Sequence, residues 1–100
     1  MDCNVDMLVL NAINTCWRER ITMPTLLHLI RTQEPPGEWM GPVDQLFMEV
    51  PVSALQRWAN RHHITRAQLA AYYQRFIVPR GDRNPELEGW LHDASMGSAF

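Results

Sequence analysis

The amino-acid sequence predicts an all-α fold, a compact bundle of five or six short helices. In several segments apolar residues recur every three or four positions, which is the period of a helix that buries one face. Alternation with period two, the pattern of a half-buried strand, is absent throughout. We expect the apolar stripes to form one core from Leu8, Ile13, Leu26, Ile30, Phe47, Leu55, Trp58, Leu69, Tyr72 and Phe76.

The length and composition indicate one domain. The chain has 100 residues, of which 46% are hydrophobic and 20% charged, enough for one core and too few for two comfortable ones. We expect a single domain over residues 1–94 and a mobile tail over 95–100. The longest apolar run, Met7–Leu10, is too short to span a bilayer, so we expect a cytoplasmic protein. Cys3 and Cys16 are expected to be free thiols.

The first half predicts two helices and a loop. An amphipathic helix is expected from about Asn4 to Arg20, and a second from Thr22, which precedes a proline suited to a first turn, to about Thr32. The following segment, 33–42, has three prolines and two glycines, so no regular element is expected there. Its Trp39 and Met40 either fold back on the core or contact a partner.

Further helices are expected in the second half. A short one should begin at Pro42 and end before Pro51, because the residue before a proline is driven out of the helical region. The stretch 53–76 then holds two helical patterns separated by a tight break. A last helix should begin at Asn84, where cap, proline and acid follow one another.

Both patterns in 53–76 open with a capping-box sequence. Ser53 is followed three residues later by Gln56, and Thr65 by Gln68. At this spacing the hydroxyl accepts from one orphan amide while the glutamine side chain reaches back to another. The second helix is therefore expected to begin at or just after Thr65, and two helices joined this closely form a helix-turn-helix.

Four residues of this stretch also have the expected residue type at particular places in the two helices and the turn. One is a small residue on the inner face of the first helix, one is an apolar residue after the turn, and two are core residues on the second helix. They are Ala59, Ile64, Leu69 and Tyr72. With them the stretch resembles the bacterial and phage helix-turn-helix regulators, whose second helix often begins with a hydroxyl and a basic residue, here Thr65 and Arg66. The resemblance covers about a quarter of the chain.

Two positions depart from that family pattern. The turn usually carries glycine, because its backbone favours the left-handed region, and here it carries His63. The residue before it is usually apolar, and here it is His62. If His62 is buried in that place, acidification should charge a buried imidazole and destabilise the domain.

Charge is unevenly distributed along the chain, although its net value is −2. Residues 1–49 contain three basic and seven acidic residues, 50–83 contain six arginines and one acid, and 84–100 contain three acids and no base. The positive segment coincides with the helix-turn-helix. Such local charge favours contact with phosphates more than the net charge of the chain would suggest.

The sequence does not indicate an enzyme. It contains no glycine-rich phosphate loop, no nucleophile elbow and no paired-cysteine motif. His62 and His63 would point about 100° apart on a helix, so they are not expected to bind one zinc ion together. We expect no catalytic residue, metal site or cofactor.

The resemblance implies a DNA-binding transcriptional regulator, acting as a homodimer, whose second helix enters the major groove of double-stranded DNA. Glutamines would read adenine edges, arginines would contact guanine or phosphate, and alanines would allow close approach. The expected DNA-binding residues are Arg57, Arg61, Thr65, Arg66, Gln68, Ala70, Ala71, Gln74 and Arg75. The first helix, or Trp90 with Leu91, could form the dimer contact.

A different class of function stays open. The chain could be a protein-interaction module, such as a phage or plasmid inhibitor or adaptor, because an alanine-rich helix face also suits docking against another helix. The acidic first half and the aromatic loop agree with this alternative. Its expected partner contacts are Trp39, Met40 and Trp90.

Overall fold

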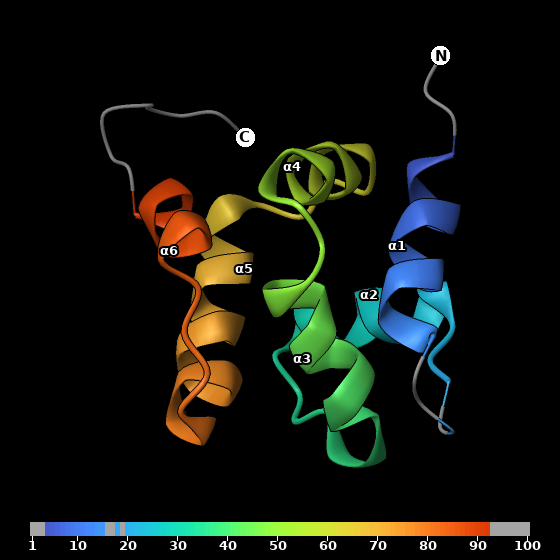
Figure 1. Ribbon diagram of the computed structural model, residues 1–100, viewed down its shortest axis with the longest axis horizontal. Coiled ribbons are helices and arrows are strands. Elements are labelled where there is room, and N and C mark those ends of the chain that lie inside the picture. Colours follow the sequence, from blue (N-terminus) through green and yellow to red (C-terminus); the bar gives the residue numbers. More distant parts are fainter. Residues whose placement is uncertain (1–3, 16–17, 19, 93–100) are drawn as a thin grey trace.

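The computed structural model describes residues 4–15, 18 and 20–92, and within them the chain forms six α-helices and no strand (Figure 1). The all-α prediction is therefore confirmed. The helices are α1 (Val5–Asn14), α2 (Met23–Thr32), α3 (Met40–Met48), α4 (Val52–Arg61), α5 (Arg66–Tyr72) and α6 (Pro85–Leu91). Shorter helical turns lie at Gly37–Trp39, Tyr73–Ile77 and Val78–Arg80.

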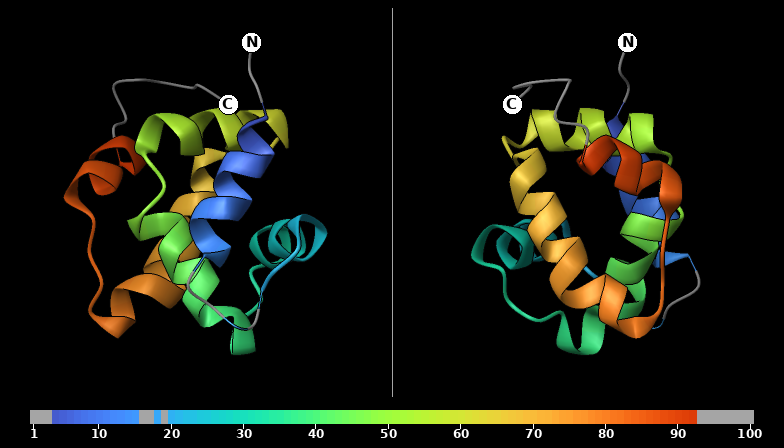
Figure 2. Two further views of the ribbon diagram at one scale, coloured as in Figure 1. Left: turned by 45° about the vertical axis from the view of Figure 1, so that its right-hand side comes forward. Right: turned by 90° about the vertical axis from the view of Figure 1, so that its left-hand side faces the viewer.

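The helices surround one core. α1 packs against α3 and α4, whereas α5 packs against α2 and α6. In Figure 1, α1 and α6 lie on opposite sides of the molecule with α3 and α5 between them, and α4 runs across the top there and in both views of Figure 2. No helix in the described part of the chain has the length and apolar character needed to cross a membrane.

Most of the predicted core residues are buried in a single hydrophobic cluster. Its largest fully buried side chains include Phe47, Trp58, Tyr72 and Tyr73. Two predictions need correction. Phe76 is only partly buried against this cluster, and Leu8 is 43% exposed. Leu8 lies on the outward side of α1 because Val5, Val9 and Ile13 occupy the side that meets α3 and α4.

The first helix is shorter than its sequence pattern predicts. α1 ends at Asn14, because the Asn14 side chain pairs with the backbone of Ile21 in both directions, at 3.0 Å each. These two hydrogen bonds stabilise a return of the chain towards α2. The predictions for Cys3, Cys16 and the tail at 95–100 concern residues outside the described ones.

Helix starts follow the predicted capping residues in most places. Thr22, Thr65 and Asn84 accept hydrogen bonds from amides three residues ahead. The predicted capping box at Ser53 is wrong. α4 already begins at Val52, after the extended backbone of Pro51, which places Ser53 inside the first turn with no side-chain cap at that end.

The loop between α2 and α3 is more regular than expected. A 3-10 turn covers Gly37–Trp39, and α3 begins at Met40 rather than at Pro42. Pro42 is tolerated because it lies in the first turn, where an amide has no partner within the helix. Trp39 is partly buried against the core, and Met40 is also half-buried. The folded-back alternative is therefore the one observed for Trp39.

Candidate functional site

The connection between α4 and α5 contains a left-handed residue. Residues 62–65 join the two helices, and His63 has a φ of +58°, a backbone conformation usually taken by glycine. The Ile64 amide donates to the carbonyl oxygen of Ala59 at 2.9 Å, and both residues are fully buried. The chain thus turns sharply at His63, and the buried Ile64 holds the turn against the core.

The start of α5 forms a complete capping box. Thr65 Oγ1 accepts from the Gln68 amide at 3.0 Å, and Gln68 Oε1 accepts from the Thr65 amide at 2.9 Å. This confirms the predicted helix start. The Gln68 side chain is directed back onto Thr65, so its carbonyl oxygen serves the cap and does not extend from the helix.

Neighbouring helices hold the end of α4. Asp6 of α1 contacts His62 Nε2 at 2.8 Å and Arg61 Nε at 3.5 Å. On the other side, Arg31 of α2 donates to the His62 carbonyl oxygen at 2.7 Å. The His62 side chain is 18% exposed and faces a carboxylate. The expectation that His62 is buried is therefore wrong, because its side chain is half-buried beside the Asp6 carboxylate.

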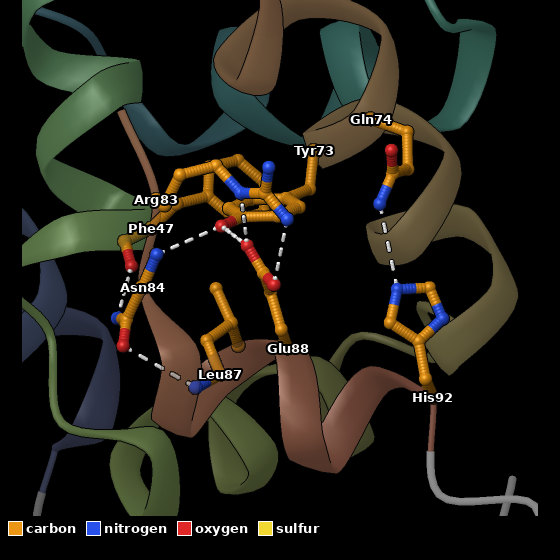
Figure 3. A network of polar contacts seen from close by, with 8 residues as sticks. All are labelled: Phe47, Tyr73, Gln74, Arg83, Asn84, Leu87, Glu88 and His92. Carbon is orange, nitrogen blue, oxygen red and sulfur yellow. Dashed lines mark hydrogen bonds and ion pairs between the residues drawn. The ribbon is translucent and has the colours of Figure 1, made fainter. Parts of the chain in front are cut away.

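α5 and the turn after it are anchored on two opposite sides. The Tyr72 hydroxyl donates to the carbonyl oxygen of Glu34 at 2.7 Å. Tyr73 points the other way, donating to Glu88 at 2.5 Å and accepting from the Asn84 amide at 2.8 Å (Figure 3). Both tyrosines are fully buried although they are adjacent, because helical elements lie on both sides of them.

The Tyr73 side of this anchor is charged. Glu88 accepts from Arg83 Nε at 2.6 Å and from Nη2 at 3.0 Å (Figure 3). Hydrogen bonds from Arg83 and then from Tyr73 lower the pKa of Glu88 to about 2. Burial, with the neighbouring Glu88, raises the pKa of Tyr73. The network keeps Glu88 ionised and connects α6 to the end of α5.

A second charged cluster joins α3 to the turn after Val78–Arg80. Arg80 Nε lies 3.9 Å from Asp44 and 3.8 Å from Asp82. The Asp44 side chain is 20% exposed. Burial, and next the hydrogen bond with Asp82, raises the pKa of Asp44 to about 6. A single arginine therefore stands between two carboxyl groups, one of which resists ionisation.

The predicted DNA-binding residues divide into two groups by exposure. Six are exposed: Arg57, Arg61, Thr65, Ala71, Gln74 and Arg75. Three are half-buried: Arg66, Gln68 and Ala70. Arg66 donates to the Trp90 carbonyl oxygen at 3.3 Å, and its guanidinium lies 5.4 Å from the centre of the Trp90 ring. Gln74, although exposed, lies 3.4 Å from His92 Nε2 (Figure 3).

Much of the positive charge in residues 50–83 is neutralised within the molecule. Arg61, Arg80 and Arg83 each form an ion pair with an acid. Arg57 and Arg75 have no acidic partner among the described residues, and both are exposed. Local sequence patterns did not indicate this neutralisation, because each acid comes from a different part of the fold or from a turn.

The structure also places the residues expected to contact a protein partner, and two exposed apolar residues that the sequence did not indicate as surface residues. Trp39, Met40 and Trp90, the partner contacts of the alternative hypothesis, are all half-buried. In contrast, Met7 is 51% exposed and Leu8 is 43% exposed, and these are the exposed large hydrophobic residues of the described part. Within those same ranges, no three His, Cys, Asp or Glu side chains are grouped as metal ligands would be.

Comparison with known proteins does not extend this description. No protein-family model matches the sequence, and no match is found among curated proteins or among solved structures.

Proposed function

We propose that this protein is a small DNA-binding regulator of the helix-turn-helix type, with α5 as the helix that enters the major groove. The observation that carries the proposal is the left-handed backbone of His63. It occupies the place where the resembled family has glycine, and it is followed by the buried Ile64 and a fully capped α5. Local sequence and backbone geometry thus agree on the same motif.

The exposed surface narrows the set of groups available for DNA contact. Ala71, Gln74 and Arg75 are exposed on α5 and the turn that continues it. Gln74 would read a base edge, and Arg75 would contact guanine or a phosphate. Arg57 is exposed on α4 and suits a phosphate contact. Gln68 supports the helix cap instead, so its role becomes structural.

The internal ion pairs predict a modest dependence on salt. Affinity falls with salt in proportion to the number of phosphates neutralised, with a slope of roughly −0.9 for each one in a plot of log K against log salt. Arg57 and Arg75 are the arginines of this segment that are exposed and have no acidic partner among the described residues. One protein chain should therefore give a slope of about −2.

The test is fluorescence anisotropy with a mixture of genomic DNA fragments at two salt concentrations. We expect the anisotropy to rise on DNA binding, the affinity to weaken with salt, and binding to be lost in the double variant Gln74→Ala, Arg75→Ala. Arg20→Ala removes one exposed arginine from the connection between α1 and α2 and should bind as the wild type does. Absence of binding by the folded wild type at low salt would refute the proposal.

One observation favours a second candidate function. Three of the six arginines in residues 50–83 are paired with acids of the same chain, which reduces the attraction for DNA. A protein-interaction module, such as an inhibitor or adaptor, needs no such excess of positive charge. If the DNA assay is negative, affinity capture should recover a specific partner with the wild type, and α5 variants Ala67→Glu and Ala71→Glu should lose it.

A further inference from the structure

Residues 79–83 form a surface turn between two fixed points. Ile77, before the turn, is fully buried, and Asn84, after it, donates from Nδ2 to the Phe47 carbonyl oxygen at 2.8 Å. Every residue of the turn is exposed except Asp82, which is half-buried. In Figure 1 this orange segment lies near the lower end of the molecule, away from α4. We refer to it as the 79–83 turn.

The tip of the 79–83 turn does not pack against the rest of the fold. Gly81 has a φ of +93°, and its amide donates to the Val78 carbonyl oxygen at 2.8 Å, a contact between near neighbours in the sequence. Among the described residues, a Cβ placed on Gly81 would meet nothing within 4 Å. The contacts of the tip with α3 are made by the side chains of Arg80 and Asp82, which both interact with Asp44.

One oxygen of Asp44 is buried without a hydrogen-bond donor. Its Oδ1 has no N–H or O–H partner among the described residues. Arg80 Nε, at 3.9 Å, is too distant for a hydrogen bond. An ionised carboxylate in this position lacks the donors that water would supply, so the neutral form is favoured. The geometry therefore favours a proton on Asp44.

The Asp82 carboxyl group provides the partner for that proton. It lies within hydrogen-bonding reach of Asp44, and because ionised carboxylates only accept, the hydrogen bond requires a proton on one of the two groups. When both are ionised they repel, and Arg80 lies 3.8 Å from Asp82 with one positive charge. Glu49, at the end of α3, adds a negative charge near Asp44. Ionisation of Asp44 thus sets one positive charge against three negative ones.

We propose that Asp44 and Asp82 form a proton-controlled switch, which holds the 79–83 turn against α3 while the two carboxyl groups share a proton and allows the turn to open once both are ionised. The proton lies between the carboxyl groups in the closed form and passes to solvent on opening. Burial, and next the hydrogen bond with Asp82, raises the pKa of Asp44 to about 6, so the closed form binds this proton more strongly than the open form does. Opening therefore increases as the pH rises from about 4 to 6 and levels off above about 7.

Opening would change the surface beside α5. The 79–83 turn overlaps the last of the helical turns that continue this helix, Tyr73–Ile77 and Val78–Arg80. Its movement would uncover the side of α3 that carries Asp44 and would leave Arg80 with Asp82 alone.

NMR titration of the aspartate carboxyl carbons tests whether the proton is shared. The midpoint measured at Asp44 should lie at about pH 6 in the wild type. Asp82→Asn should lower this midpoint, because its amide can donate to the ionised form, whereas Arg80→Gln should raise it by removing the nearby positive charge. Glu86→Gln removes an exposed acid from α6 and should leave it unchanged. An Asp44 midpoint that Asp82→Asn does not lower would overturn the proposal.

Hydrogen exchange of the Gly81 amide, corrected for the intrinsic effect of pH, tests the opening itself. In the wild type and in Glu86→Gln, its protection factor should fall about fivefold between about pH 5 and pH 7.5, after allowance for solvent screening. Asp44→Asn should hold the protection factor constant over this range, because its amide donates to Asp82 without titrating.

Two results of the exchange experiment would overturn the proposal. One is a wild-type Gly81 protection factor that does not fall with pH or that falls equally in Asp44→Asn. The other is a Gly81 amide as strongly protected as the slowest core amides, because the turn would then open only when the whole domain unfolds. Neither experiment involves DNA, so the proposed function and the switch are refuted independently.

Discussion

Replacement of His63 by glycine is expected to stabilise the protein. At its φ of +58°, a residue with a side chain is strained by about 1–2 kcal/mol. Glycine relieves this strain, but its greater freedom in the unfolded chain costs about 0.5–1 kcal/mol. The net gain in the free energy of unfolding should be about 0.5–1 kcal/mol. For a chain of this length, the corresponding increase in Tm is about 2–5 °C.

Gln33 provides a matched control, because its backbone is also left-handed, with a φ of +60°. Its side chain, however, donates to the carbonyl oxygens of Ile30 at 2.8 Å and Gln68 at 3.2 Å. Each hydrogen bond contributes about 0.5–1.5 kcal/mol, so Gln33→Gly should lower the free energy of unfolding by up to about 2 kcal/mol. Among the described residues, the His63 side chain meets no hydrogen-bond partner that glycine would remove.

Urea denaturation followed by circular dichroism at 222 nm compares the wild type with both variants. The expected order of stability is His63→Gly, wild type, Gln33→Gly. A His63→Gly variant that is no more stable than the wild type would refute the idea that the turn stores backbone strain. Equal gains in both variants would show that the Gln33 hydrogen bonds contribute nothing.

Three other predictions concern stability. Asp44→Asn should raise the free energy of unfolding by about 1 kcal/mol at pH 7.5, after allowance for solvent screening, and should leave it unchanged near pH 4. The reason is that the pKa of Asp44 is raised to about 6, so this carboxyl group destabilises the fold only when it ionises. Urea titrations at the two pH values check this, and a larger gain at pH 4 would contradict it. Trp58→Ala should lower the free energy of unfolding by about 3–5 kcal/mol, since the indole is fully buried and its Nε1 donates to Met23 Sδ. A loss of less than roughly 1 kcal/mol would mean that the core closes around the gap. Tyr73→Phe should cost about 1–2 kcal/mol by leaving the Asn84 amide without its acceptor, and an unchanged melting curve would count against that network.

Much of the fold could be predicted from short-range pattern. The helix starts at Thr22, Thr65 and Asn84 each depend on a side chain and an amide three residues apart. The interaction is complete within one turn, so sequence spacing is sufficient to locate it. The end of α1 could not be found this way. It depends on Asn14 and Ile21, whose pairing requires the chain between them to return.

At the candidate site, too, local sequence spacing predicted some features and contacts between distant residues decided the others. Of the DNA contacts predicted from the sequence on the second helix, Ala71, Gln74 and Arg75 are exposed as expected, whereas Ala70 is half-buried. Sequence spacing could not show that Arg66 is held by Trp90, which lies 24 residues further along the chain. Nor could it show that Leu8 faces outward, because the apolar residues of α1 surround much of the helix and the neighbouring helices select which of them are buried.

By itself the sequence determined the helical class, most of the helix starts and the capped turn between α4 and α5, because these depend on backbone geometry and on side chains at most four residues apart. The tertiary structure decided which charges remain available at the surface and which apolar residues remain exposed. Arg61 is paired with Asp6, although 55 positions separate them in the sequence. Such a contact arises only when packing brings α1 against α4, and no local pattern contains that information.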